Sequence, residues 1–168
     1  MNTGVLYGLL AGFICTAFLS LLYFIDFQNI LTGYEKLSWF VILVFLFLGL
    51  NRERSLKEDK FLAFNDALKV SYQIFTLAYV VKFIFIYSLF NFYDTKLLEI
   101  ARETAIKIFI EHKNQDIPEE IFEQQVTEFG KGYFGPRFFD IGIMLELVAG
   151  FILSLIAAYI MKREKPDY

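Results

Sequence analysis

The sequence has one cysteine and one histidine, and this scarcity excludes several kinds of site. A disulfide within the chain needs two cysteines, whereas Cys15 stands alone in an apolar run. A histidine cluster that could hold zinc cannot form around His112 alone. A Ser–His–Asp set has no candidate, because His112 lies in a polar, acidic segment. We therefore expect no metal site and no cofactor.

Other functional patterns are missing as well. The chain has no glycine-rich loop that could cradle a phosphate group. The basic segment 52–60 is short, mixes both signs of charge and lacks interleaved aromatic residues, so nucleic-acid binding has no support. The acids at 116–128 do not form the tight loop of oxygen ligands that calcium requires. These absences favour a protein that is not an enzyme.

Long apolar runs are what the sequence has in abundance. Of its 168 residues, 57% are hydrophobic and 21% are charged, and the charges gather at 52–60, 94–131 and 162–167. A soluble domain would interleave its charges with its apolar residues. The pattern predicts an all-α, polytopic membrane protein that forms a single membrane domain over residues 1–168.

Four transmembrane helices are predicted, because four apolar segments approach or exceed the length needed to cross a bilayer. They comprise residues 4–25, 37–51, 66–93 and 137–161. The second segment is short for a crossing, and Trp39 near its start suits an aromatic anchor at the membrane interface. Pro136 suits the first position of the last helix.

The distribution of Lys and Arg predicts the orientation. Segment 52–60 holds four bases against three acids, and Lys162, Arg163 and Lys165 follow the last crossing. Basic residues close to the ends of crossings favour the cytoplasmic side. With four crossings, both the N-terminus and the C-terminus are predicted to be cytoplasmic.

The segment between the third and fourth crossings, 94–135, is then predicted to lie outside the cytoplasm. Its first half carries apolar residues at helical spacing, among them Leu97 and Ala101. Asp116 and Glu119 form a capping-box pattern that begins a second helix. We expect an extracytoplasmic amphipathic helical hairpin, which either lies on the bilayer or stands above it.

Small residues recur every four positions in the first and fourth crossings. The helix-packing stripes that they form include Gly4, Gly8, Gly12, Gly142, Gly150 and Ser154. Such stripes let two helices approach closely. We expect them to mark helix–helix contacts. Glu146 lies within the second stripe, so we expect it to face another helix and not lipid.

Lys82 and Glu146 are charges within predicted crossings, at depths that agree closely by helical rise. A Lys–Glu pair would neutralise two charges that are costly inside a bilayer. One interpretation is a buried pair that specifies how the helices assemble. The alternative is a proton or ion relay, or a grip on a lipid head group.

A second polar line runs along the third crossing and lies on one helical face; its members are Asp66, Lys69, Gln73 and Thr76. The simpler interpretation is hydrogen bonding between helices, with Lys69 reaching the cytoplasmic interface. The functional interpretation is a face for a partner, or a pocket for an anionic lipid head group shared with Arg52 and Arg54.

Four short motifs occur in a characteristic order. They are YGLLAG at 7–12, GLNR at 49–52, FNDALKV at 64–70 and LE at 145–146. Together with an acidic amphipathic loop before the last helix and a basic tail, they resemble the small Bacteroidota membrane family catalogued as domain of unknown function 4199. The resemblance covers nearly the whole chain. Members of the family usually end the cytoplasmic loop with glycines, which 57–61 lacks.

The resemblance implies a four-helix protein of the bacterial inner membrane with no established activity. It also implies an association, through neighbouring genes, with a family-2 glycosyltransferase that acts on lipid-linked sugars such as polyprenyl-phosphate derivatives. A helical bundle could anchor such a cytoplasmic catalytic domain beside its lipid substrate.

Three hypotheses of function follow. The first is a non-catalytic accessory or scaffold subunit, in contact with membrane lipids, that binds a membrane enzyme such as the glycosyltransferase, another complex, or a second copy of itself. The second is a small oligomeric transporter or channel that uses Lys82 and Glu146. The third, an enzyme that acts on lipid head groups, has least support because no acid–base or nucleophile set is visible.

Overall fold

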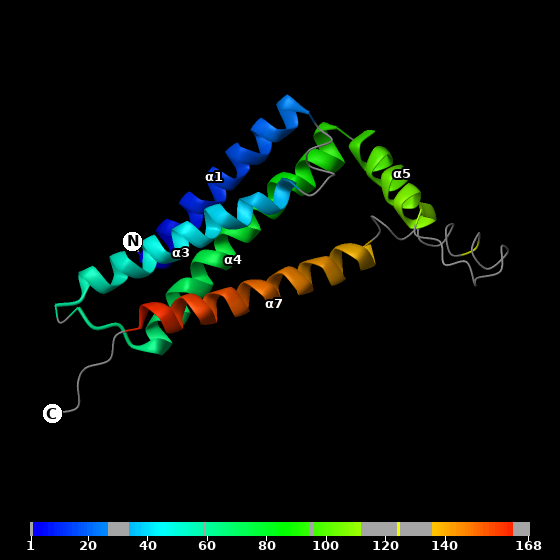
Figure 1. Ribbon diagram of the computed structural model, residues 1–168. Helices are drawn as coiled ribbons and strands as arrows, with labels where there is room; N and C mark the ends of the chain where they lie inside the picture. Colours follow the sequence, from blue (N-terminus) through cyan, green and yellow to red (C-terminus); the bar gives the residue numbers. More distant parts are fainter. Residues whose placement is uncertain are drawn as a thin grey trace. The chain divides into compact units, whose positions relative to one another are not determined.

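A computed structural model describes residues 2–26, 34–58, 60–94, 96–111, 124 and 136–162 of the chain. Among these residues the regular elements are all helical, as the sequence predicts. In chain order they are α1 (Thr3–Ile25), the 3-10 turn η1 (Tyr34–Leu37), α3 (Ser38–Leu56), α4 (Phe64–Ser88), the π-helical turn η2 (Leu89–Tyr93), α5 (Lys96–Glu111) and α7 (Pro136–Met161) (Figure 1).

Local signals explain where several helices begin. Asn2 caps α1, since its side-chain oxygen accepts a hydrogen bond of 2.9 Å from the N–H of Gly4. Pro136 is the first residue of α7, as predicted, where the missing N–H of proline costs nothing. Between α3 and α4 the chain turns through Lys60, whose φ of 54° is a left-handed conformation that is uncommon outside glycine.

Three helices in the described part of the chain are long and apolar enough to cross a membrane. They are Thr3–Ile25, Phe64–Tyr93 and Ile143–Met161. They coincide with the first, third and fourth predicted crossings. The chain therefore has the make-up of a helical membrane protein.

The second predicted crossing, 37–51, lies in α3, which does not have the composition of a full crossing. α3 continues beyond its apolar part and ends at Leu56. Because α3 has 19 residues, any stretch of membrane-spanning length in it includes Arg52, Glu53 and Arg54. Whether the second predicted crossing spans a membrane thus depends on how α3 is placed, and not on its composition.

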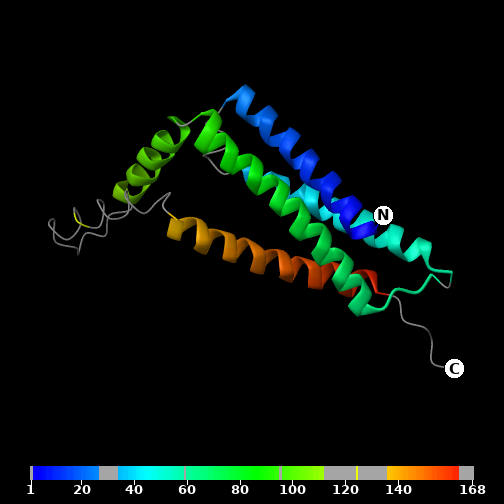
Figure 2. The ribbon, with the colours of Figure 1, turned by 180° about the vertical axis from the view of Figure 1, so that it is seen from behind.

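The chain divides into two compact units. The first comprises Met1–Ile86 and Leu147–Tyr168, and the second comprises Tyr87–Glu146. α1, α3, most of α4 and the later part of α7 belong to the first unit. In both views α1, α3 and α4 run side by side (Figures 1 and 2).

The glycines of α1 face α4. A Cβ added at Gly8 would lie 2.8 Å from the Cβ of Leu77, and one added at Gly12 would lie 2.7 Å from the Cβ of Val81. Carbon atoms do not approach so closely, so only glycine permits this separation of the two helices. Leu77 and Val81 are one turn apart, which matches the spacing of the glycines.

α3 runs antiparallel to α1 and begins beside its middle. The Sγ of Cys15 donates a hydrogen bond of 3.5 Å to the backbone oxygen of Ser38, the first residue of α3. Near the other end of α3, a Cβ added at Gly49 would lie 3.4 Å from the side chain of Tyr7. The last turns of α3 therefore lie beside the first turns of α1.

Trp39, the expected aromatic anchor of α3, packs against α4. The centroid of its ring lies 5.6 Å from that of Phe75, which is half-way along α4. The reason is that α3 begins beside the middle of α1, so the first turn of α3 is inside the bundle. Trp39 packs between helices at mid-height.

The later part of α7 packs on α4 in the first unit. A Cβ at Gly150 would collide with the ring of Phe75, and Gly150 is buried. The hydroxyl of Ser71 donates a hydrogen bond of 3.1 Å to the backbone oxygen of Ser154, whose side chain is also buried. Gly142 lies in α7, but its packing is outside the described part of the chain.

The second unit contains η2, α5 and the beginning of α7. The third predicted crossing extends into η2, and the N–H of Asp94 closes that turn on the backbone oxygen of Leu89 at 2.8 Å. α5 is the first helix of the predicted hairpin 94–135. The second helix of that hairpin, with its capping-box residues, lies outside the described residues, as does His112.

Candidate functional site

Lys82 lies in α4 with only 3% of its surface exposed. Its Nζ is 5.5 Å from the centroid of the Tyr79 ring and 5.9 Å from that of Trp39. Aromatic faces attract a cation electrostatically. Tyr79 in turn stacks on Phe75 and Phe83, at centroid distances of 5.9 Å and 6.3 Å. The charge that the sequence places within a crossing is therefore held against aromatic rings of α3 and α4.

Glu146 lies in α7 and is partly exposed. It belongs to the second compact unit, whereas Lys82 belongs to the first. The pairing of Lys82 with Glu146 therefore stays a prediction.

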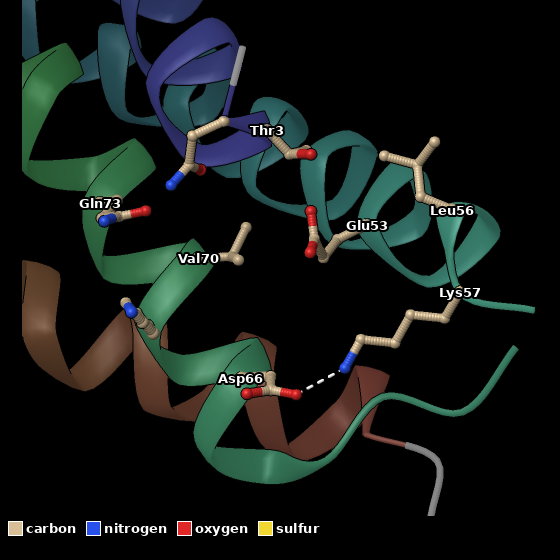
Figure 3. A pocket seen from close by; sticks show the side chains of 9 residues that line it. Thr3, Glu53, Leu56, Lys57, Asp66, Val70 and Gln73 are labelled. Carbon is tan, nitrogen blue, oxygen red and sulfur yellow. Dashed lines mark hydrogen bonds and ion pairs between the residues drawn. The ribbon is translucent and has the colours of Figure 1, made fainter.

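A polar pocket of about 490 Å³ opens at one end of the first unit, where α1 begins, α3 ends and α4 begins (Figure 3). Its lining residues are Asn2, Thr3, Glu53, Leu56, Lys57, Asp66, Lys69, Val70 and Gln73. The volume is within the range of about 300–1,000 Å³ that is usual for small-molecule sites. The first three residues of the predicted polar line of α4 thus form one wall of a cavity, whereas Thr76 does not line it.

An ion pair joins two walls of this pocket. The Nζ of Lys57, immediately after α3, contacts Oδ2 of Asp66 in the first turn of α4 (Figure 3). The two side chains are 33% and 55% exposed, so the pair contributes about 1 kcal/mol or less to stability. Its main effect is to tie the end of α3 to the start of α4.

The other two charges of the pocket are Glu53 from α3 and Lys69 from α4. Neither forms an ion pair with another side chain in the part of the chain that the structure describes. Gln73 extends into the pocket, and its Oε1 is buried without a hydrogen-bond partner among the described residues (Figure 3). The pocket therefore offers one unpaired cation, one unpaired anion and one unpaired acceptor.

Arg52 and Arg54, which we expected to share a pocket with this polar line, do not line it. Arg52 is exposed, and the guanidinium of Arg54 donates a hydrogen bond of 2.8 Å to Oδ1 of Asn51. Glu53 and Lys57 occupy their place. The pocket consequently carries both signs of charge, whereas the sequence suggested a cationic one.

Two parts of these sites were not predicted from the sequence. Glu53 and Lys57 are four residues apart, a spacing that indicates a helix continuing into the charged run with both side chains on one face. Tyr79 is three residues before Lys82, so its proximity was also readable from helical spacing. Trp39 carried no such signal, because its contact with Lys82 depends on how α3 packs on α4.

In the described part of the chain, no group of three or more His, Cys, Asp or Glu side chains could hold a metal ion.

Comparison with known proteins identifies the family. No curated protein and no solved structure matches the sequence. The chain belongs to the family described as Protein of unknown function (DUF4199), whose model matches residues 6–163. This match confirms the resemblance that the sequence motifs carry.

Proposed function

We propose that this DUF4199 protein is a non-catalytic membrane subunit, a helical scaffold that binds a membrane-associated enzyme or complex. The family resemblance favours a family-2 glycosyltransferase with a polyprenyl-phosphate substrate as the partner. In this role the chain holds the enzyme at the bilayer and takes no chemical step itself.

The observation that carries this proposal is the burial of Lys82. A transporter or channel that used this charge would need water or an ion path beside it. Lys82 is instead 3% exposed and lies against the rings of Trp39 and Tyr79. Such packing suits a charge that fixes how α3 and α4 meet, and it favours a structural role over transport.

The small-residue stripes are used within the chain, which leaves other surfaces for a partner. Gly8 and Gly12 face α4, and Gly150 faces Phe75. The side chains of Ile152, Ile156 and Ile160 recur every four residues on α7 and are 50%, 50% and 60% exposed. This exposed face of α7 is our candidate for contact with the partner.

We further infer that the chain crosses the bacterial inner membrane four times, with both termini in the cytoplasm. Support comes from the pocket, which Thr3 at the start of α1 and Glu53 near the end of α3 line together. If α1 crosses the membrane, the chain must return before α3 ends. The bases of segment 52–60 favour the cytoplasm for that end.

Extraction of the full chain in a gentle detergent tests the proposed function. We expect an enzyme to co-purify at fixed stoichiometry. We expect the variant Ile152→Ala/Ile156→Ala to lose this partner, because it shortens side chains of the exposed face of α7 on which the partner would pack. The control Phe13→Ala trims a side chain that is 63% exposed on α1 and should retain the partner.

One result would reject the scaffold proposal. If the chain purifies only as a homo-oligomer, and that oligomer moves ions across liposomes in a manner that Lys82→Met abolishes, the protein is a channel or transporter.

A further inference from the structure

The pocket between the ends of α1, α3 and α4 has a charge balance that restricts what can bind in it. Lys57 and Asp66 neutralise each other at its wall. Glu53 and Lys69 remain, one anion and one cation, on opposite helices. A ligand with a single charge would satisfy one of them and face the other with like charge. A zwitterion satisfies both.

The cationic part of the ligand needs N–H donors. The Oε1 of Gln73 is buried without a partner, and its amide lies against Gly4, where an added Cβ would be only 2.5 Å from it. An ammonium group carries three donors. It can therefore donate to the Glu53 carboxylate, and to the Oε1 of Gln73 once that amide turns from Gly4 toward the pocket, whereas a quaternary ammonium has no N–H to donate.

The anionic part has two sources of positive potential. One is the ammonium of Lys69. The other is the beginning of α1, where Asn2 and Thr3 line the pocket and Asn2 caps only the N–H of Gly4. The first N–H groups of a helix lack partners within it and favour phosphate oxygens.

The wall of the pocket along α4 is long enough to span the head-group layer of a membrane and to reach past it. From Asp66 to Gln73 the wall of α4 extends for about 10 Å by helical rise. The polar layer on each side of the hydrocarbon core is about 5–8 Å thick. Leu56 and Val70 add an apolar part to the lining, suited to glycerol and the first acyl carbons.

We propose that this pocket binds a phosphoethanolamine group, with the phosphate at Lys69 and the start of α1 and the ammonium at Glu53 and Gln73. The proposal is independent of the scaffold role, because it requires no protein partner. The group is carried by phosphatidylethanolamine lipids and also exists as a small soluble molecule, and the experiment separates these two sources.

Calorimetric titration of the full chain in detergent micelles with short-chain lipids tests the chemistry without any mutation. Dihexanoyl phosphatidylethanolamine should bind at least about tenfold more tightly than its phosphatidylcholine and phosphatidylglycerol counterparts. The choline lipid has the same charges but no N–H donor on its cation, and the glycerol lipid has no cation. Equal binding of the ethanolamine and glycerol lipids, or no binding of any of them, overturns the proposal.

Matched variants then assign the residues. Glu53→Gln should weaken the binding of the ethanolamine lipid by about tenfold, the size of one charge-assisted hydrogen bond. Glu58→Gln makes the same charge change at an exposed residue outside the pocket and should leave the affinity unchanged. Lys69→Gln should weaken binding while Arg52→Gln does not. Equal effects of Glu53→Gln and Glu58→Gln contradict the assignment.

Soluble glycerophosphoethanolamine, which has the same phosphodiester and ammonium as the lipid but no acyl chains, distinguishes the source. If it binds as tightly as the short-chain lipid, the natural ligand is a soluble molecule. If the lipid binds about tenfold more tightly or better, the pocket uses the apolar wall and the ligand is a membrane lipid. Both results support the same recognition chemistry.

Discussion

At the scale of single residues, two glycines one turn apart in α1 face different kinds of obstacle. A Cβ at Gly8 would lie 3.1 Å from the backbone oxygen of Ile74 and 2.8 Å from the Cβ of Leu77. A Cβ at Gly4 would approach most closely the Oε1 of Gln73, the far end of a flexible side chain, and would lie 3.0 Å from the Cβ of Gln73. Backbone cannot yield unless the whole of α4 moves, whereas an amide can rotate.

We therefore predict unequal costs for the same substitution. Gly8→Ala should lower the free energy of unfolding by about 1–3 kcal/mol, the usual cost of overpacking, and Gly4→Ala by less than about 1 kcal/mol. Unfolding of the micelle-bound protein by sodium dodecyl sulfate, followed by circular dichroism, measures both. Ala17→Leu on the exposed face of α1 is the neutral control. Equal losses at Gly4 and Gly8 would contradict the geometric argument.

At this scale the sequence predicted correctly which residues of one helix share a face. The four-residue spacing predicted that Gly4, Gly8 and Gly12 share one face, and that face lies against α4. It did not predict that Lys82 lies beside Trp39, because no periodicity within α4 reports the position of α3. Contacts between helices depend on the packing of whole surfaces, which the spacing along one helix does not determine.

At the scale of helices, α7 is held to α4 by a close approach and a hydrogen bond. Gly150 admits the ring of Phe75, and Ser71 donates to the backbone oxygen of Ser154 one turn later. Tyr72 and Phe151 add an edge-to-face ring contact at a centroid distance of 5.6 Å. The hydrogen bond requires the close approach, so loss of the glycine should separate the two helices.

Gly150→Leu should displace the later part of α7 from α4 and lower the free energy of unfolding by about 1–3 kcal/mol or more. Disulfide formation between Ser71→Cys and Ser154→Cys under mild oxidation measures the separation, because it needs no bulky reagent to reach these buried positions. Most of the cross-linked product should be lost when Gly150→Leu is added.

The control for this experiment is Ile156→Leu, a change on the exposed face of α7 that should leave cross-linking intact. A Cys15→Ser background removes the native thiol and keeps a donor for the backbone oxygen of Ser38. Undiminished cross-linking in Gly150→Leu would show that α7 does not depend on this contact.

At the scale of the whole molecule, the number of crossings decides where the termini lie. Four crossings place both termini on one side, whereas crossing by only the three apolar helices places them on opposite sides. The pocket favours four, since it is lined by Thr3 from the start of α1 and by Leu56 from the end of α3.

We predict that reporters fused to the N-terminus and the C-terminus both report a cytoplasmic location. In intact cells, a membrane-impermeant maleimide should label Glu103→Cys on the exposed surface of α5 and leave Ser55→Cys near the end of α3 unlabelled. Termini on opposite sides, or labelling of both cysteines from outside, would exclude the four-crossing arrangement.

Hydropathy predicted the three long crossings to within a few residues, because length and apolar content are properties of each segment alone. It predicted the start of α3 to within one residue, but it could not predict that this start lies beside the middle of α1, where Cys15 donates a hydrogen bond to the backbone oxygen of Ser38. The pocket was predictable only in part. Asp66, Lys69 and Gln73 were found by spacing, whereas Glu53 and Thr3 join them only when three helix ends meet.

The position of Trp39 has a spectroscopic consequence. It is the only tryptophan of the chain, and its ring lies 5.6 Å from Phe75 and 5.9 Å from the ammonium of Lys82. Tryptophan fluorescence, excited at wavelengths that tyrosine does not absorb, therefore comes from Trp39 alone and reports on the junction of α3 and α4. The protein carries a built-in optical reporter there, so any event that loosens this junction can be followed by fluorescence without attaching a dye.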